Sequence, residues 1–282
     1  MLLARRAPSL RATARRLGLV VAIVVIGVVA VLLAARLYYP RLLYPAPLSD
    51  AHAPSEGTLL TLTARDGVTV HATQLAGPSN APVMVYFHGN GVVMGDMLWM
   101  AREFVRRGIG VVLCEYRGYG LSAGSPRVTP TEAGLYDDAE AVLAALSESG
   151  IDSKRVALFG ESLGTGVAVE MAARGHAASL VLVTPYTSIP EVASRFAFGL
   201  PVQLLMKERF DSLEKAPRVS VPTLLLHGTK DGVVPYAMGA KLSTAFPHAR
   251  LITVAGGHHN DLFLRSGARF FDEVAEFVRH PG

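Results

Sequence analysis

The sequence predicts an α/β fold in which a mostly parallel sheet of about eight strands is covered by helices on both faces. From residue 58 onward, short apolar runs alternate with longer segments of helical spacing. The runs are apolar at nearly every position, which is typical of parallel strands buried on both faces. A chain of 282 residues can form one such domain, and its 50% hydrophobic content excludes a disordered chain.

The first two strands are expected to form an antiparallel hairpin at one edge of the sheet. Residues 58–76 alternate apolar and polar side chains around the turn dipeptide Asp66-Gly67. Strands and helices then alternate, and Thr131 is a suitable N-cap for one of the helices. Further strands are expected at 83–89, 110–116, 156–160, 179–185, 223–228 and 250–256, with helices at 96–107, 131–149, 163–174, 236–246 and 267–279.

A long apolar segment precedes this domain. Residues 17–35 carry no charged side chain, and as a helix they would be about 28 Å long, close to the roughly 30 Å hydrocarbon core of a bilayer. The segment before it is rich in arginine, and this charge bias predicts a cytoplasmic N-terminus and an extracytoplasmic domain. We therefore expect a single-pass signal anchor. A cleaved signal peptide and an organelle-targeting peptide are the alternatives.

The chain accordingly divides into four parts, of which the third is expected to lack regular structure because of its prolines. The expected parts are a basic cytoplasmic tail (1–16), a transmembrane signal anchor (17–36), a linker (37–57) and a catalytic domain (58–282). Within the domain, the apolar segment 186–210 reads as a short cap that shapes an acyl pocket or dips toward the bilayer, or simply as a core-facing helix.

The excess of basic over acidic side chains comes from the N-terminal part of the chain. Seven of the 27 basic residues are arginines within residues 1–41, so the rest of the chain has fewer basic side chains than its 23 acidic ones. No nucleic-acid partner is therefore expected. The single cysteine, Cys114, permits no intramolecular disulfide and no cysteine zinc cluster. Neither a metal nor an organic cofactor is expected.

Two stretches match the pattern Gly-x-Ser-x-Gly that marks a nucleophile turn: GLSAG around Ser122 and GESLG around Ser162. A nucleophile elbow joins a strand directly to a helix. Ser122 comes after a loop and before two prolines, so it is expected to be a loop residue. Ser162 lies between a buried strand and a good helix, with glycines where the two approach closely. Ser162 is therefore the candidate nucleophile.

A serine nucleophile needs a base, an orienting acid and donors for an oxyanion. Asp231 follows a strand and is the candidate acid, while His258 and His259 both follow the last strand, and the residues alone do not choose between them. The backbone N–H groups of Asn90 and Leu163 are the candidate oxyanion donors.

His88 lies on the wrong strand to act as the base, and a structural hydrogen bond in its loop is expected instead.

The motifs YFHGNG, EYRGYGLSAGSP, FGESLG, RFDS, LLLHGTKDGVVP and GGHHNDL occur in an order that resembles the α/β-hydrolase superfamily. The chain is most similar to its membrane-anchored branch, which includes mammalian acyl-protein thioesterase relatives. The resemblance implies that His259 is the base and that His258 replaces a glycine of those relatives. Glu115 stands where many relatives have Asp, which implies a structural salt bridge. The cysteine cluster by which thioesterase relatives attach to membranes is missing from this sequence.

The expected function is hydrolysis of carboxylic esters or thioesters through an acyl-serine intermediate, with a small acyl ester, a lysolipid or an acyl thioester as substrate. Fold alone does not select among these substrates. Two alternatives stay open. A serine peptidase of the same fold would need a site for the free amine of its substrate, and a non-catalytic scaffold would leave an intact triad unused.

Overall fold

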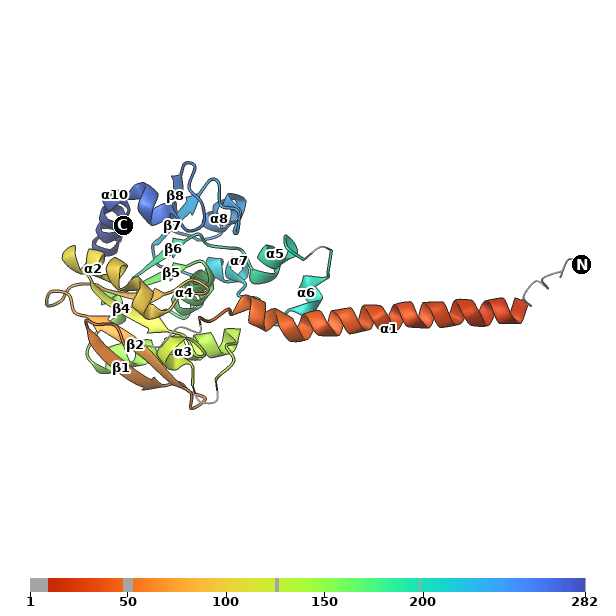
Figure 1. Ribbon diagram of the computed structural model, residues 1–282. Coiled ribbons are helices and arrows are strands. Elements are labelled where there is room, and N and C mark those ends of the chain that lie inside the picture. The colour runs from red at the N-terminus through yellow and green to blue at the C-terminus, as the bar shows by residue number, and fades with distance from the viewer. Residues whose placement is uncertain (1–9, 48–52, 125–126, 198, 282) are drawn as a thin grey trace, which may run out of the picture.

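A computed structural model describes residues 10–47, 53–124, 127–197 and 199–281. It shows an α/β domain from which one long helix, α1 (Leu10–Leu43), projects (Figure 1). Most of the expected basic tail, residues 1–9, lies outside the described residues. The fold class predicted from the sequence is confirmed.

The domain is built on an eight-stranded sheet of order β1-β2-β4-β3-β5-β6-β7-β8. The hairpin of β1 and β2 lies at one edge, and β2 also pairs antiparallel with β4. Every other neighbouring pair is parallel. The strands are β1 (Thr58–Thr63), β2 (Thr69–Leu75), β3 (Val83–Phe87), β4 (Gly110–Glu115), β5 (Val156–Glu161), β6 (Ser179–Val183), β7 (Thr223–Gly228) and β8 (Ala249–Val254).

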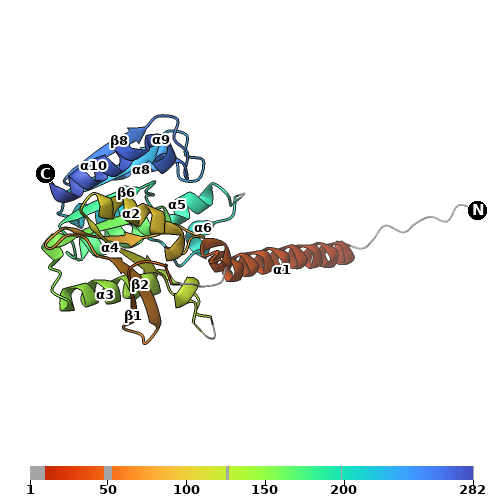
Figure 2. The same cartoon turned by 60° about the vertical axis from the view of Figure 1, so that its left-hand side comes forward.

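Helices cover both faces of the sheet, as Figure 2 shows. The buried side chains of α2, α9 and α10 pack on one face, and those of α3, α4 and α8 pack on the other. Each face thus has its own apolar core, which is why the central parallel strands are apolar at most positions. The helices are α2 (Leu98–Arg106), α3 (Glu132–Glu148), α4 (Leu163–Ala173), α8 (Tyr236–Ser243), α9 (Leu262–Ser266) and α10 (Ala268–Arg279).

The boundaries of several helices differ from expectation. Thr131 caps α3 as predicted, with its Oγ1 accepting a hydrogen bond from the N–H of Gly134 at 3.0 Å. The expected helix 96–107 instead begins as a 3₁₀ turn, Met94–Met97, and the short helix α9 was not anticipated. Gly267, with φ +53°, separates α9 from α10 in a conformation that favours glycine.

Between β6 and β7 the chain forms a short cap of three small helices, α5 (Ile189–Ser194), α6 (Val202–Leu205) and α7 (Ser212–Lys215). The cap is not a simple core-facing helix. Ile189 and Val202 are buried, whereas Leu204 is 80% exposed.

Helix α1 is long and apolar enough, over Ala14–Leu43, to cross a membrane, and its most apolar window is not buried in the protein. The expectation that residues 37–57 lack regular structure is wrong for their first part, because α1 continues through Pro40 to Leu43. Packing explains the difference. Leu43 contacts the core and Tyr44 is buried in it, so the domain stabilises the last turn of α1 despite the hydrogen bond lost at Pro40.

Candidate active site

Ser162 lies at a sharp turn between β5 and α4, where a nucleophile elbow is expected. Its φ of +49° and ψ of −115° are strained for a residue with a side chain. Its N–H donates to the carbonyl of Val183 at 3.0 Å, which holds the turn against β6. A side chain at Gly164 would overlap the backbone of Phe87, so the second glycine of the motif permits the close approach of helix and strand.

Three side chains from three different loops meet at this turn. The Oγ of Ser162 lies 2.8 Å from Nε2 of His259, and Nδ1 of His259 lies 2.7 Å from Oδ2 of Asp231. Both distances are those of hydrogen bonds. The structure therefore brings together the serine, the histidine and the aspartate that the sequence singled out.

The carboxylate of Asp231 is held on both oxygens. Its Oδ1 accepts hydrogen bonds from the N–H groups of Val233 and Val234, at 2.9 Å and 2.8 Å. Burial by itself raises the pKa of Asp231, but the hydrogen bonds from His227 and His259 outweigh burial and hold that pKa well below its usual range. Asp231 therefore stays ionised and faces His259 as an acceptor.

Sequence reasoning missed His227, a fully buried residue at the end of β7. Its Nε2 lies 3.0 Å from the carbonyl of Val234 and 3.3 Å from Oδ2 of Asp231. Both partners are acceptors, so Nε2 carries the proton. The sequence signal for this contact is the spacing of four residues between His227 and Asp231.

The neighbouring histidine, His258, is not part of this constellation. It is exposed, and its backbone N–H donates to Oδ1 of Asp261 at 2.6 Å. Of the two candidate bases, the structure places His259 at Ser162.

The residues expected to supply the oxyanion donors, Asn90 and Leu163, line the same pocket as Ser162. Leu163 is the first residue of α4, so its N–H has no partner within the helix. A Cβ at Gly89 would be 3.5 Å from Cβ of Ser162, so the loop that continues into Asn90 passes directly over the serine. The side chain of Asn90 has a role that was not foreseen, because its Nδ2 donates to the carbonyl of Leu43, at the end of α1, at 2.5 Å.

The second motif forms a different structure. Ser122 is buried at the end of a 3₁₀ turn, Gly120–Ser122. Its Oγ donates to the carbonyl of Glu115 at 3.1 Å and accepts from the N–H of His71 at 2.8 Å. Its hydroxyl thus fixes a loop, as predicted.

His88 and Glu115 form a buried pair next to the site, with Nε2 of His88 3.6 Å from Oε1 of Glu115. Burial lowers the pKa of His88 to about 4 and raises the pKa of Glu115 to about 8. Burial therefore disfavours the charged form of both groups, which argues against the strong salt bridge expected at Glu115. Arg117, in the loop after Glu115, forms ion pairs with Asp138, at 2.7 Å, and with Asp66. The structural role expected for His88 is confirmed by its contact with the carbonyl of Gly89, 2.8 Å from Nδ1.

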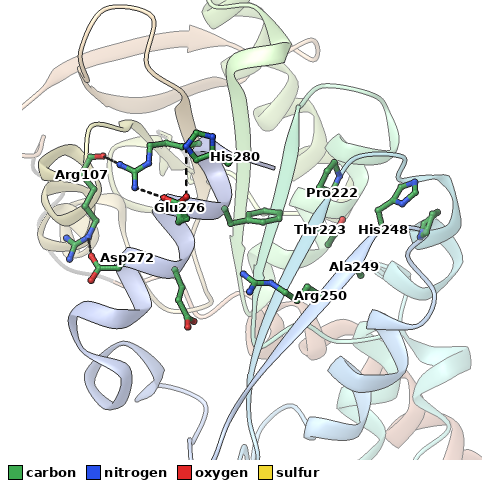
Figure 3. Close-up of a pocket in the computed structure, with 13 residues that line it drawn as sticks. Arg107, Pro222, Thr223, His248, Ala249, Arg250, Asp272, Glu276 and His280 are labelled. Carbon is green, nitrogen blue, oxygen red and sulfur yellow. Dashed lines mark hydrogen bonds and ion pairs between the residues drawn. The ribbon is translucent and has the colours of Figure 1, made fainter. Parts of the chain in front are cut away.

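A pocket of about 670 Å³ opens onto Ser162 and His259, and most of its lining is apolar. A larger cavity of about 960 Å³ lies at the opposite end of the sheet, where β7 and β8 begin (Figure 3). Several of its charged side chains pair with one another, as in Arg107 with Asp272 and Arg279 with Glu276. Since α/β sheets bind ligands at the carboxyl ends of their strands, the pocket at Ser162 is the candidate site.

Within the described ranges, no cluster of three side chains suited to a metal ion was found.

Comparison with known proteins places this geometry in context. The family model described as "Serine aminopeptidase, S33" matches residues 78–210, and the one described as "TAP-like protein" matches residues 202–282. An uncharacterized protein of Mycobacterium tuberculosis is 34% identical over 71% of this chain and 70% of its own length. The alpha/beta hydrolase domain-containing protein 17C of Mus musculus is 30% identical over 77% of this chain and 66% of its own length.

Solved structures of esterases share the fold. An esterase from Rhodococcus sp. ECU1013 superposes with a TM-score of 0.60 at 21% identity, covering 79% of this chain and 99% of that one. The esterase Pf2001 of Pyrococcus furiosus superposes with a TM-score of 0.69 at 17% identity, covering 83% and 98%.

Proposed function

Because the chain belongs to the α/β-hydrolase superfamily, we propose that it is a membrane-anchored serine hydrolase that cleaves carboxylic esters or thioesters. One observation carries the proposal. Ser162, His259 and Asp231 form a continuous hydrogen-bonded chain, with distances of 2.8 Å and 2.7 Å, at a strained strand-to-helix turn. This is the geometry that activates a serine hydroxyl.

In the first half of the reaction, Oγ of Ser162 attacks the acyl carbonyl carbon while Nε2 of His259 takes the hydroxyl proton. Asp231, ionised and held on both oxygens, orients the imidazole and stabilises its positive charge. The N–H groups of Asn90 and Leu163 would bind the developing oxyanion, and loss of one such donor typically costs about 3 kcal/mol of transition-state stabilisation. The leaving alcohol or thiol departs with the proton from His259.

In the second half, His259 takes a proton from water, whose oxygen attacks the acyl carbon. Collapse of this intermediate returns the proton to Oγ of Ser162 and releases a carboxylic acid. The residues involved supply all the proton transfers, so the mechanism calls on no cofactor.

A peptidase is the second candidate, because one matching family model is described as a serine aminopeptidase. Such an enzyme needs a negative charge near the nucleophile to bind a free amine. Glu161 lines the pocket, but burial raises its pKa and its Oε2 accepts a hydrogen bond from the hydroxyl of Tyr86 at 2.5 Å. A carboxyl in this environment is a poor amine site, and the apolar lining favours acyl groups instead.

We further propose that α1 crosses the membrane with its N-terminus in the cytoplasm and the domain on the other side. The length and composition of α1 support the crossing. The arginines that precede the apolar segment support the direction. Reporter fusions at the two ends of the chain would test this orientation.

The function is tested with the purified full chain in detergent, using p-nitrophenyl esters of rising chain length and aminoacyl p-nitroanilides. We expect hydrolysis of the esters by the wild type, loss of that activity in Ser162→Ala, and retention of it in Ser122→Ala. Faster hydrolysis of the amides would favour the peptidase. A wild type that is inactive on both sets of substrates would favour the hypothesis of a non-catalytic scaffold.

A further inference from the structure

The pocket at Ser162 has two walls of different origin. One wall belongs to the cap and includes Phe196 and Leu200. The other is supplied by the end of α1, through residues that include Ala35, Tyr38 and Leu42. The helix that connects the domain to its proposed membrane span is therefore also part of the cavity that opens onto the nucleophile.

Hydrogen bonds fix this wall to the rest of the site. Nη1 of Arg36 donates to the carbonyl of Leu205 in α6 at 3.0 Å. The hydroxyl of Tyr39 accepts from the N–H of Lys207 at 2.9 Å and donates to the carboxylate of Glu208. At the far end, the carbonyl of Leu43 is bound by Asn90, as described above. The end of α1 is thus joined both to the cap and to the loop over Ser162, and it is not a loose tether.

The position of this wall relative to a bilayer follows from helix length. A crossing takes about 20 residues, so a span that begins at Leu17 ends near Arg36. The segment 35–43 begins at that point, and it carries Tyr38 and Arg41, residue types that are enriched at membrane interfaces. With α1 crossing the membrane as proposed above, the mouth of the pocket would lie at the surface of the bilayer.

The rim of the pocket on this side is apolar and exposed. Phe196 and Leu42 line the pocket and are 55% and 80% exposed, and Leu204 of the neighbouring helix α6 is 80% exposed. Figure 1 shows α5 and α6 close to the domain end of α1. Each would gain free energy on leaving water, at roughly 25 cal/mol per Å² of apolar surface. An apolar path thus leads from the bilayer into the pocket.

We propose that residues 35–43 of α1 form part of an acyl-binding site, and that this site takes a single-chain acyl lipid directly from the bilayer. The inference rests on the proposed serine hydrolase function and on the proposed crossing of the membrane by α1. The chain of the lipid lies between α1 and the cap, with its ester carbonyl at Ser162. Hydrolysis breaks the bond between acyl carbon and headgroup oxygen, so a fatty acid and the headgroup alcohol leave.

The geometry favours a lipid over an acyl group carried by a protein. Because the α1 wall continues directly from the span, a lipid that lies against α1 reaches the pocket without crossing water. A polypeptide would have to pass between the domain and the bilayer where α1 and the cap are joined by hydrogen bonds.

Two neighbouring alanines of α1 provide a matched test. Ala35 lines the pocket, whereas Ala34 is exposed and does not line it. Tryptophan at either position suits a membrane interface, but only at residue 35 would its side chain fill the pocket. The full chain is reconstituted in nanodiscs, and kcat/KM is measured for 1-palmitoyl-lysophosphatidylcholine in the disc and for soluble p-nitrophenyl butyrate.

We expect Ala35→Trp to lower the ratio of the palmitoyl to the butyryl value of kcat/KM at least tenfold, and Ala34→Trp to leave it within twofold of wild type. Equal ratios in the two variants would overturn the inference. So would a wild type that cleaves the butyrate ester but not the lysolipid, or one that prefers an S-palmitoyl peptide in the same discs. A wild type inactive on every ester would instead contradict the proposed function.

A second measurement does not depend on the folding of the two tryptophan variants. In Ser162→Ala, a lysolipid with a photoactivatable group in its acyl chain can occupy the pocket without being cleaved. After irradiation in nanodiscs we expect cross-links to residues 35–43 and to the cap. Cross-links confined to residues 17–33 would show that the chain stays in the bilayer, and would overturn the inference.

Discussion

The chain contains two copies of one five-residue pattern, and their structures differ in every respect that matters for chemistry. Ser122 lies on a 3₁₀ turn, and its Oγ is 3.5 Å from Nδ1 of His71, at the limit of a hydrogen bond. Ser162 lies at a strained elbow, 2.8 Å from His259, which Asp231 orients. A serine near a histidine is therefore not enough. The backbone must present the hydroxyl, and a carboxylate must fix the base.

The largest expected difference between the two regions comes from their histidines. We expect His259→Ala to lower kcat/KM for p-nitrophenyl butyrate about 10⁵-fold or more, because removal of a triad base disables the whole unit. His71→Ala should leave that value within threefold. A comparable loss in both variants would mean that His71 has a part in the chemistry.

The next largest effect is expected at Asp231, the acid that orients His259 and that has no counterpart in the loop of Ser122. Asp231→Asn keeps the size of the side chain but removes its charge, and we expect kcat to fall about 10⁴-fold with KM changed little. Steady-state kinetics with the same ester measure this. Asp66→Asn, near the other loop, is the matched control and should retain full kcat. A loss of tenfold or less in Asp231→Asn would argue against the orienting role.

The glycines that open the two patterns should differ in their effect on stability. A Cβ at Gly160 would overlap the backbone of Gly164 and Thr165, whereas at Gly120, where φ is +38°, it would meet only the carboxyl end of the Glu115 side chain. We expect Gly160→Ala to lower the free energy of unfolding by about 3 kcal/mol or more, and Gly120→Ala by about 1–2 kcal/mol. Urea unfolding of the full chain in detergent measures both. The reverse order would contradict the tighter packing of the elbow.

The last effect is on the pH dependence of stability and concerns Glu115, whose backbone carbonyl accepts a hydrogen bond from Ser122. Its pKa is raised by burial to about 8. The native state therefore binds more protons than the unfolded state between the usual carboxyl pKa and about pH 8, so stability falls as pH rises through that window. Glu115→Gln removes the titration, and we expect its stability relative to wild type to increase by up to a few kcal/mol from pH 5 to pH 8.5. Thermal unfolding measures this difference, and a constant difference would contradict it.

Much of the fold and of the site could be predicted from sequence because the signals are local. Apolar runs indicated the parallel strands, and the glycines around Ser162 indicated a close approach of strand and helix. Chain order pointed to Asp231, whose carboxylate the structure places 2.7 Å from His259. The choice of His259 over His258 came from resemblance to a family, since two adjacent histidines in a loop cannot be told apart by pattern.

The rest depends on contacts between distant parts of the chain. The continuation of α1 through Pro40 depends on the packing of Leu43 and Tyr44 on the domain, which no local pattern reports. The raised pKa of Glu115 depends on its burial. The contribution of α1 to the wall of the pocket was not foreseen either, because prolines led us to expect an unstructured linker over residues 37–57.

The most direct measurement of the central claim is the position of a covalent adduct. The full chain in nanodiscs is treated with a fluorophosphonate probe, digested, and mapped by mass spectrometry. We expect one equivalent of probe on Ser162 and none on Ser122, with labelling lost in Ser162→Ala. A wild type that stays unlabelled, or that carries its adduct on Ser122, would contradict the assignment of Ser162 as the nucleophile.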